Sequence, residues 1–226
     1  MATQRKDDGP AQEREFAHQR ALMVQRHVAD RGIKDERVLQ AMREVPRHLF
    51  VPALVAAKAY GAGALPIGAK QTISQPYIVA RMIELLDLMG KEKVLEIGTG
   101  TGYQAVVLSK LCAKVFSIER VNELALRAVE LIRTLKIYNA SVKVFDGTYG
   151  WSDQAPFDRI IVAAAAPEVP EPLLQQLSRT GKLVIPIGPE GNQRLARVMR
   201  VGTRLQVEDC GSAEFVPLVG RFGWKE

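Results

Sequence analysis

Short apolar runs alternate with helix-like segments in the second half of the chain. Five of these runs have the length of buried strands and occupy residues 94–97, 115–118, 142–145, 160–164 and 183–187. Helical spacing of apolar residues separates or follows them at 103–112, 121–135 and 171–178. Strands that alternate with helices are typical of a parallel sheet with both faces covered. This pattern predicts an α/β fold with a doubly wound, mostly parallel sheet.

The first ninety residues have a helical pattern instead. Apolar positions predict a helix over 16–31, and Gly32 suits its C-terminal end. Asp35 can cap a second, short helix, which must end before Pro46 because proline disfavours helical geometry in the residue before it. This part of the chain is therefore expected to form a helical layer.

Three other segments complete the pattern. By composition, residues 61–73 are a loop, and Pro76 opens a helix that we expect to end at Gly90. Alternating apolar positions at 193–219 predict antiparallel strands that close one edge of the sheet, including a strand from Phe215 to Val219. Residues 1–12 are polar and broken by Gly9-Pro10, which predicts an irregular start.

Composition narrows the class of protein. Of the 226 residues, 47% are hydrophobic and 25% charged, as in globular domains. Cys112 and Cys210 have no metal-ligand spacing, so we expect no metal and a reducing compartment. No apolar stretch has the roughly 20 residues of a membrane span, and the N-terminus lacks the apolar region of a secretory signal. We therefore expect a cytoplasmic protein without a membrane partner.

The net charge of +6 raises the possibility of a nucleic-acid partner. The positive excess is spread thinly along the chain, with no block of like charges and no aromatic-basic stripe. A lightly basic, solvated surface is the more common outcome, so we expect no nucleic-acid partner and a monomer.

The most informative stretch is VLEIGTGTGYQ at 94–104. A strand ends at Ile97, Gly98, Gly100 and Gly102 follow, and a helix starts near Tyr103. Glycine lets the backbone approach a ligand closely, and the helix N-terminus adds free N–H groups. The dinucleotide fingerprint G-x-G-x-x-G is not met, because Tyr103 stands where its third glycine belongs.

Acidic residues around this loop suggest the ligand. Glu96 precedes the first glycine by two residues, and a carboxylate there suits a positively charged ligand better than a diphosphate. Glu119 ends the second strand, about 20 residues past the glycines, where it can bind both ribose hydroxyls. Asp146-Gly147 follows the third strand and can reach an adenine edge. Together these residues predict a pocket for S-adenosyl-L-methionine; the alternative is a glycine turn with two surface acids.

Several motifs in order give the chain a family resemblance. It resembles the protein-L-isoaspartate O-methyltransferases from about Ile33 to Phe222. The most specific segment is GAKQTISQPYIVARM at 68–82, which general methyltransferases lack. The supporting segments are VPRHLFVP at 45–52, the glycine loop at 94–104, DGTYGWSDQAPFDRIIVAAAAPEVP at 146–170 and FVPLVGRFGW at 215–224.

The resemblance implies one methyltransferase domain over 16–226, preceded by a flexible extension at 1–15. Within the domain, it implies a helical layer with the active-site loop at 16–90, the cofactor-binding sheet at 91–192 and C-terminal strands at 193–226. The implied reaction is methyl transfer from S-adenosyl-L-methionine to the carboxylate of L-isoaspartyl residues in damaged proteins and peptides. The ester then closes to a succinimide, which begins repair and leaves S-adenosyl-L-homocysteine as the other product.

Site residues follow from the same motifs. Ser74 precedes a helix N-terminus, where its hydroxyl can bind a carboxylate; the alternative role is a helix cap. Thr72 and Ile73 are expected to line the same loop through their backbone. Arg47 is either a partner of the substrate carboxylate or a surface arginine, and Val219 belongs to a segment whose backbone can receive the peptide as an added strand.

Three departures from the family pattern stand out. Phe145 replaces the first glycine of Gly-Asp-Gly, Ala213-Glu214 stands where an arginine is common, and residues 1–15 extend beyond the usual start.

Other readings remain open at this point. A nucleic-acid methyltransferase shares the fold, but AAAAPEVP at 163–170 is not the Asn/Asp-Pro-Pro-aromatic tetrapeptide of base N-methylation, and neither cysteine follows a proline. A nicotinamide oxidoreductase is disfavoured by Tyr103 and Glu96. A non-catalytic protein that binds S-adenosyl-L-methionine or a peptide is the third alternative.

Overall fold

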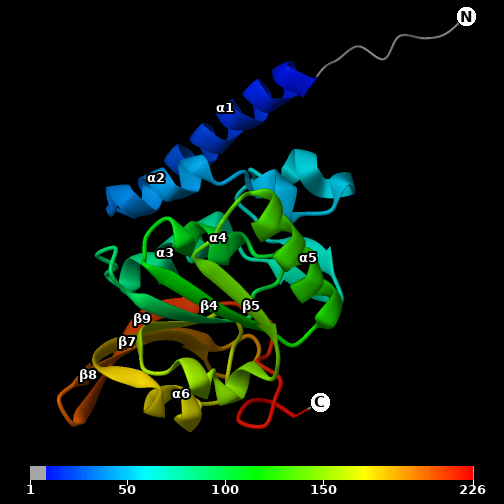
Figure 1. Ribbon diagram of the computed structural model, residues 1–226. Helices are drawn as coiled ribbons and strands as arrows, with labels where there is room; N and C mark the ends of the chain where they lie inside the picture. Colours follow the sequence, from blue (N-terminus) through cyan, green and yellow to red (C-terminus); the bar gives the residue numbers. More distant parts are fainter. Residues whose placement is uncertain (1–8, 226) are drawn as a thin grey trace, which may run out of the picture.

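A twisted sheet of parallel and antiparallel strands forms the centre of the molecule (Figure 1). The computed structural model describes residues 9–225, and within them this sheet has the order β5-β4-β3-β6-β7-β8-β9. Strands β3 to β7 are parallel, while β8 and β9 run antiparallel along one edge. The strands span Lys93–Ile97 (β3), Lys114–Glu119 (β4), Ala140–Val144 (β5), Phe157–Val162 (β6), Leu177–Ile187 (β7), Gln193–Val201 (β8) and Arg204–Ala213 (β9). The predicted doubly wound, mostly parallel sheet is confirmed.

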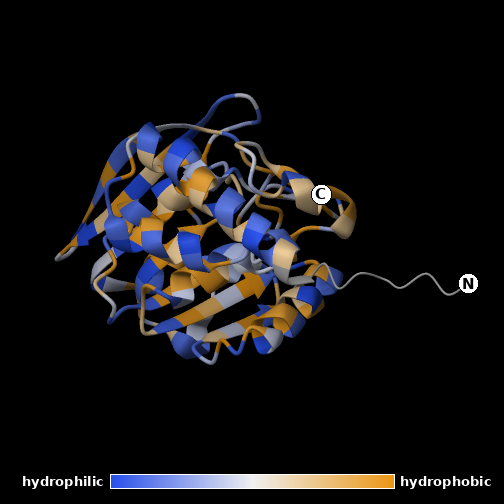
Figure 2. Ribbon diagram, turned by 90° about the horizontal axis from the view of Figure 1, so that it is seen from above, coloured by the Kyte–Doolittle hydropathy of each residue, from blue (hydrophilic) through white to orange (hydrophobic). Residues whose placement is uncertain are grey.

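Helices cover both faces of the sheet. Figure 1 shows α3, α4 and α5 on one face, beneath α1 and α2, and the short α6 on the other. The helices span Gly9–His27 (α1), Glu36–Glu44 (α2), Pro76–Leu85 (α3), Tyr103–Ser109 (α4), Asn122–Thr134 (α5) and Glu171–Gln175 (α6). Viewed from above, hydrophilic and hydrophobic residues alternate along this helical layer (Figure 2), as expected of helices that bury one side.

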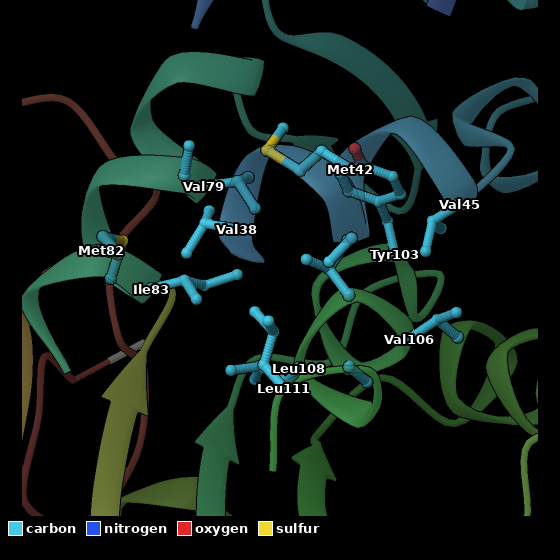
Figure 3. Packing of buried hydrophobic residues seen from close by; sticks show 14 of the residues in the cluster. Val38, Met42, Val45, Val79, Met82, Ile83, Tyr103, Val106, Leu108 and Leu111 are labelled. Atoms are coloured by element: carbon cyan, nitrogen blue, oxygen red, sulfur yellow. The ribbon is translucent and has the colours of Figure 1, made fainter. Parts of the chain in front are cut away.

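The larger hydrophobic core lies between these helices and the sheet. Figure 3 shows side chains of α2, α3 and α4 converging there, among them Met42, Met82 and Leu108, which are fully buried. Burial of one such side chain stabilises the fold by about 1.5–3 kcal/mol. A smaller core, around Phe157 and Leu173, lies against the opposite face of the sheet. Because the sheet is covered on both sides, its parallel strands appear in the sequence as mostly apolar runs.

Local signals in the helical layer act as predicted, except at the start. The Asp35 carboxylate accepts a hydrogen bond from the backbone N–H of Arg37 and caps α2, which ends at Glu44. Gly32 has a φ of 102° after a single 3-10 turn at Ala29–Arg31. The predicted irregular start is wrong for residues 9–12, because α1 already begins at Gly9; residues 1–8 of the expected flexible extension lie outside the described residues. Proline is tolerated in a first helical turn because its missing N–H has no partner there anyway.

Three segments differ from the prediction. Residues 61–73 contain an antiparallel hairpin of β1 (Leu65–Gly68) and β2 (Gln71–Ile73) instead of only a loop. The segment from Phe215 to Val219 is not a strand. Its backbone makes only isolated pairings. The N–H of Ala165 donates to the Val216 carbonyl, the N–H of Leu218 donates to the Ala165 carbonyl, and Val219 pairs with Trp224. Helix α3 also ends at Leu85, before Gly90.

Candidate active site

The glycine loop joins β3 to α4 and exposes its backbone at the carboxyl edge of the sheet. Gly98 has a φ of 92° and Gly102 a φ of 93°, a region that residues with a side chain rarely adopt. The N–H of Gly98 donates to the Ile118 carbonyl at 2.8 Å, which fixes the loop to β4. A Cβ on Gly102 would lie 3.3 Å from the Cβ of Ala128, so this glycine also lets the loop pack against α5.

Glu119 at the end of β4 is hydrogen-bonded to the backbone of the glycine loop. Its carboxylate accepts hydrogen bonds from the N–H groups of Gly100 at 2.8 Å and Val121 at 2.9 Å. A carboxylate oxygen has more than one lone pair, so these bonds leave acceptor capacity for a ligand hydroxyl. The residue expected to bind the ribose is therefore fixed beside the loop expected to receive the cofactor.

A cavity of 480 Å³ opens above these residues, within the range usual for small-molecule sites. It lies at the carboxyl ends of β3 and β6, where the strand order reverses, which is the usual ligand position in open α/β sheets. The sequence-predicted residues that line this cofactor cavity are Thr72, Ile73, Ser74, Gly98, Gly100, Glu119, Gly147 and Val219. Gly102 is not among them and serves the turn and the contact with α5.

A second, larger cavity of 1190 Å³, which we call the outer groove, lies on the other side of the Ser74 loop. Its walls come from α3, from the end of β9 and from the segment that follows it, including Arg81, Ser212 and Phe215. Thr72 and Ser74 line both cavities, as do Ala163, Val216 and Pro217. The segment around Ser74, which we call the Ser74 loop (residues 72–75), therefore lies in the wall that the cofactor cavity and the outer groove share.

Ser74 is not the cap of α3. The capping position is Gln75, and no side chain makes a capping hydrogen bond there. Pro76 occupies the first turn, where proline's missing N–H costs little. The capping alternative for Ser74 is therefore wrong, and its hydroxyl is left for a ligand.

Glu96 and Asp146 were expected at the ligand, but neither lines the described cavities. Glu96 is fully buried behind the loop, where the Ser117 hydroxyl donates to its carboxylate. Burial raises the pKa of Glu96 to about 8, and the Ser117 hydrogen bond opposes the shift. Asp146 turns toward the C-terminal segment and accepts from the N–H groups of Thr148 and Arg221, each at 2.9 Å.

Arg47 also requires a correction. Its side chain is fully buried, so the surface alternative is wrong, and it lines neither the cofactor cavity nor the outer groove. Its guanidinium instead donates to two backbone carbonyls, those of Ala59 and Ser74. Arg47 supports the Ser74 loop from behind.

Sequence reasoning missed part of the cavity wall. Ala163 and Ala164 follow β6 and face the glycine loop from the neighbouring strand. Their position directly after a buried strand was the available signal, because parallel strands bring their carboxyl ends to one edge. Ile67 and Lys70 of the unpredicted hairpin also line the cavity.

Two general properties bear on the type of site. Within residues 9–225, no three histidine, cysteine or acidic side chains are grouped as a metal site would need. In the same part of the chain, no helix combines the length and apolarity required to cross a bilayer. Cys112 and Cys210 are both free thiols, and Cys112 is buried.

A parallel sheet with a glycine loop after its first strand, an acid at the end of its second and a cavity at the switch point fits the class of S-adenosyl-L-methionine-dependent methyltransferases. Residues 18–223 match the profile of the protein-L-isoaspartate(D-aspartate) O-methyltransferase family. The chain belongs to this family.

Curated relatives agree over nearly the whole length. The protein-L-isoaspartate O-methyltransferase of Geobacter metallireducens is 50% identical over 207 residues, which cover 91% of this chain and 95% of the relative. The protein of the same name from Syntrophus aciditrophicus is 48% identical over 212 residues, covering 92% and 97%.

Solved structures agree as well. One protein-L-isoaspartate O-methyltransferase superposes with a TM-score of 0.82 at 26% identity, covering 92% of this chain and 67% of its own. The Plasmodium falciparum protein, described as a putative member in complex with S-adenosyl-L-homocysteine, gives a TM-score of 0.76 at 25% identity, covering 87% and 96%.

Proposed function

We propose that this protein transfers a methyl group from S-adenosyl-L-methionine to the free carboxylate of L-isoaspartyl residues in damaged proteins and peptides. The methyl ester then closes to a succinimide, whose hydrolysis returns part of the damaged residue to aspartate. The observation that carries the proposal is the position of Ser74 between the cofactor cavity and the outer groove. A group there can touch a substrate carboxylate from one side while the cofactor lies on the other.

The residues of the cofactor cavity fit S-adenosyl-L-methionine. Glu119 supplies acceptors for ribose hydroxyls, and the glycine loop supplies backbone that no side chain covers. Thr72, Ile73 and Gly147 line further parts of the cavity wall. When bound, S-adenosyl-L-methionine supplies the methyl group and keeps the electron pair of its sulfur–carbon bond.

The chain's own part in the reaction is to hold the carboxylate and exclude water. A carboxylate with an ordinary pKa of about 3–4 is ionised at pH 7, so the reaction needs no general base. In agreement with this, no histidine lines the cofactor cavity or the outer groove among the described residues. The Ser74 hydroxyl then acts as a hydrogen-bond donor that positions the anion, because a nucleophilic serine would form an ether that cannot pass the methyl group on.

The outer groove suits a polypeptide substrate. Its 1190 Å³ exceed what one amino-acid side chain needs, and backbone groups contribute to its wall beside Ser74. The proposed peptide-receiving segment is partly occupied, since the N–H of Leu218 already donates to Ala165. The groups left to meet a peptide are therefore those of Pro217 and Val219, which both border the cofactor cavity.

The test compares an L-isoaspartyl peptide with its L-aspartyl twin, using tritiated S-adenosyl-L-methionine. Base-labile label on the isoaspartyl peptide and little on the aspartyl one is expected. DNA and RNA serve as further substrates in the same assay. Equal labelling of both peptides, or labelling of nucleic acid alone, would refute the proposal.

Location and assembly belong to the same proposal. We infer a monomer of one domain over 16–226 that acts in the cytoplasm on protein substrates, without nucleic acid. Two free cysteines and a substrate of damaged cellular proteins support this location. Sedimentation equilibrium that gave twice the chain mass at micromolar concentration would contradict the monomer.

A further inference from the structure

One short segment behind the active site is hydrogen-bonded to both of its loops. This segment is the 3-10 turn η2 (Arg47–Phe50). The guanidinium Nη2 of Arg47 donates to the Ser74 carbonyl at 2.7 Å. On the other side, the Thr101 hydroxyl of the glycine loop donates to the Phe50 carbonyl at 2.6 Å. The cofactor loop and the substrate loop therefore share one support.

Aromatic contacts strengthen that support. Tyr103, the first residue of α4 after the glycine loop, lies 4.9 Å from the Arg47 guanidinium carbon, measured to the ring centroid. The Phe50 ring meets the same tyrosine edge-on, with centroids 5.5 Å apart. Figure 3 shows Tyr103 among the buried side chains of α2 and α4, close to Met42 and Val45. The tyrosine is thus held between the core and the arginine.

Burying the Arg47 guanidinium lowers the free energy of unfolding, so a contribution to stability does not explain why an arginine stands at this position. The side chain is fully buried, yet no carboxylate pairs with it among residues 9–225. Burial lowers the pKa of Arg47, and in this part of the chain only the neighbouring Tyr103 and Tyr60 side chains oppose that shift. An apolar side chain of similar size would usually cost less at such a position. A buried charge that lowers stability in this way is typical of positions where the function requires that side chain.

We propose that Arg47 is a positioning residue that fixes Ser74 relative to the cofactor loop. It holds the Ser74 backbone, and so sets where the hydroxyl meets the substrate carboxylate. This assignment rests on the proposed function. A displacement of about 1 Å in a reacting geometry costs on the order of a hundredfold in rate. Lysine cannot replace Arg47 fully, because an ammonium lacks the planar fork that binds two carbonyls and stacks on a ring.

The experiment uses Arg47→Met and Arg47→Lys in the full-length chain. We expect Arg47→Met to lower kcat for the isoaspartyl peptide ten- to a hundredfold at saturating substrates, and Arg47→Lys to restore part of that loss. The Kd for S-adenosyl-L-methionine, measured by calorimetry, should change less than threefold, because Glu119 and the glycine backbone are untouched.

A matched control and a double variant separate positioning from a general structural role. Arg200 also donates to a backbone carbonyl, that of Leu174 at 2.6 Å, and has an unpartnered buried nitrogen, but it lies away from both cavities. Arg200→Met should therefore keep kcat within twofold. If Arg47 acts through Ser74, Arg47→Met combined with Ser74→Ala should be no more than about threefold slower than the slower single variant.

Several results would overturn the assignment of Arg47 as a positioning residue. A folded Arg47→Met protein with wild-type kcat would overturn the assignment, and so would two losses that multiply in the double variant. If Arg47→Met does not fold, an Arg47→Lys protein with wild-type kcat would overturn it, and a fivefold or greater loss would support it. A wild-type chain that methylates no isoaspartyl peptide would refute the proposed function itself and the assignment with it.

Discussion

Replacing Glu96 with glutamine should stabilise this protein far more at alkaline than at acidic pH. Glu96 is fully buried in β3, and burial raises its pKa from an ordinary value of 4.5 to about 8. The hydrogen bond from Ser117 opposes this shift without cancelling it. Glutamine keeps the shape and an acceptor for Ser117 but has no charge to bury.

The sign follows from the protons bound in each state. Between about pH 4.5 and pH 8 the folded chain keeps the Glu96 proton, whereas the unfolded chain releases it. The free energy of unfolding of the wild type therefore falls as pH rises through this window. At about 1.4 kcal/mol per unit of pKa difference, the Glu96 contribution changes by roughly 3–4 kcal/mol between pH 5 and pH 8.5. The glutamine variant lacks this change.

Urea denaturation of both proteins at pH 5, 7 and 8.5 measures the effect. The advantage of Glu96→Gln over wild type should grow by roughly 3–4 kcal/mol between pH 5 and pH 8.5, since about 1.4 kcal/mol corresponds to each pKa unit. A change of about 1 kcal/mol moves Tm by about 2–4 °C in a chain of this size, so melting curves should diverge by roughly 6–16 °C. The pH 5 pair is the internal control. A difference in unfolding free energy that stays constant over this range would refute the reasoning.

Substitutions at three further positions test the site. Ser74→Ala should lower the rate constant of single-turnover methyl transfer about ten- to a thousandfold. This corresponds to a loss of about 1.4–4 kcal/mol of transition-state stabilisation, and the affinity for the cofactor should be nearly unchanged. Ser74→Thr should be milder, and full activity of Ser74→Ala at saturating peptide would withdraw the role. Glu119→Ala should weaken S-adenosyl-L-methionine binding at least tenfold by calorimetry, because each bond to a charged acceptor contributes about 1.5–3 kcal/mol. Gln193, whose side-chain amide donates to the Phe215 carbonyl at 2.9 Å and accepts from its N–H at 2.7 Å, fixes the wall of the outer groove. Gln193→Leu should raise the peptide KM and destabilise the fold by about 1–3 kcal/mol, and an unchanged KM would exclude this part of the groove from peptide binding.

The parallel half of the fold was predictable from sequence because its strands are buried on both faces. The predicted runs at 94–97 and 115–118 match β3 and β4 to within one residue, and the run at 160–164 overlaps β6 but starts three residues late. A strand between two layers of helices is buried on both sides, so most of its positions are apolar and its signal in the sequence is nearly continuous. The strand β5 lies at the edge, and its run was displaced by one or two residues.

The hairpin at 65–73 was not predictable in this way. Its turn places Ala69 and Lys70 at φ values of 49° and 57°, where glycine or asparagine would normally signal the turn. The segment from Phe215 to Val219 failed for a different reason. Its apolar residues favour a strand, but in the structure Pro217 and Val219 form only isolated bridges, with Ala165 and Trp224.

Spacing located the glycine loop, Glu119 and Gly147 because each follows a strand at the same edge of the sheet. It could not locate side chains whose direction depends on packing. Glu96 and Arg47 belong to the right motifs, but their side chains point into the interior. Motif membership and ligand contact are therefore separate properties.

Buried hydrogen bonds link three segments that lie far apart in the sequence. Arg47 comes from VPRHLFVP, Ser74 from QTISQP and Thr101 from the glycine loop. Arg47 holds Ser74, and Thr101 holds the carbonyl of Phe50, three residues from that arginine. A change in any one segment would alter the support of the other two, even though Arg47 and Phe50 line neither cavity. Under the proposed role of Ser74, these residues together set the distance between the cofactor loop and the hydroxyl that meets the carboxylate. This distance is what an in-line methyl transfer requires, since positioning is the main source of rate when no base and no nucleophile take part.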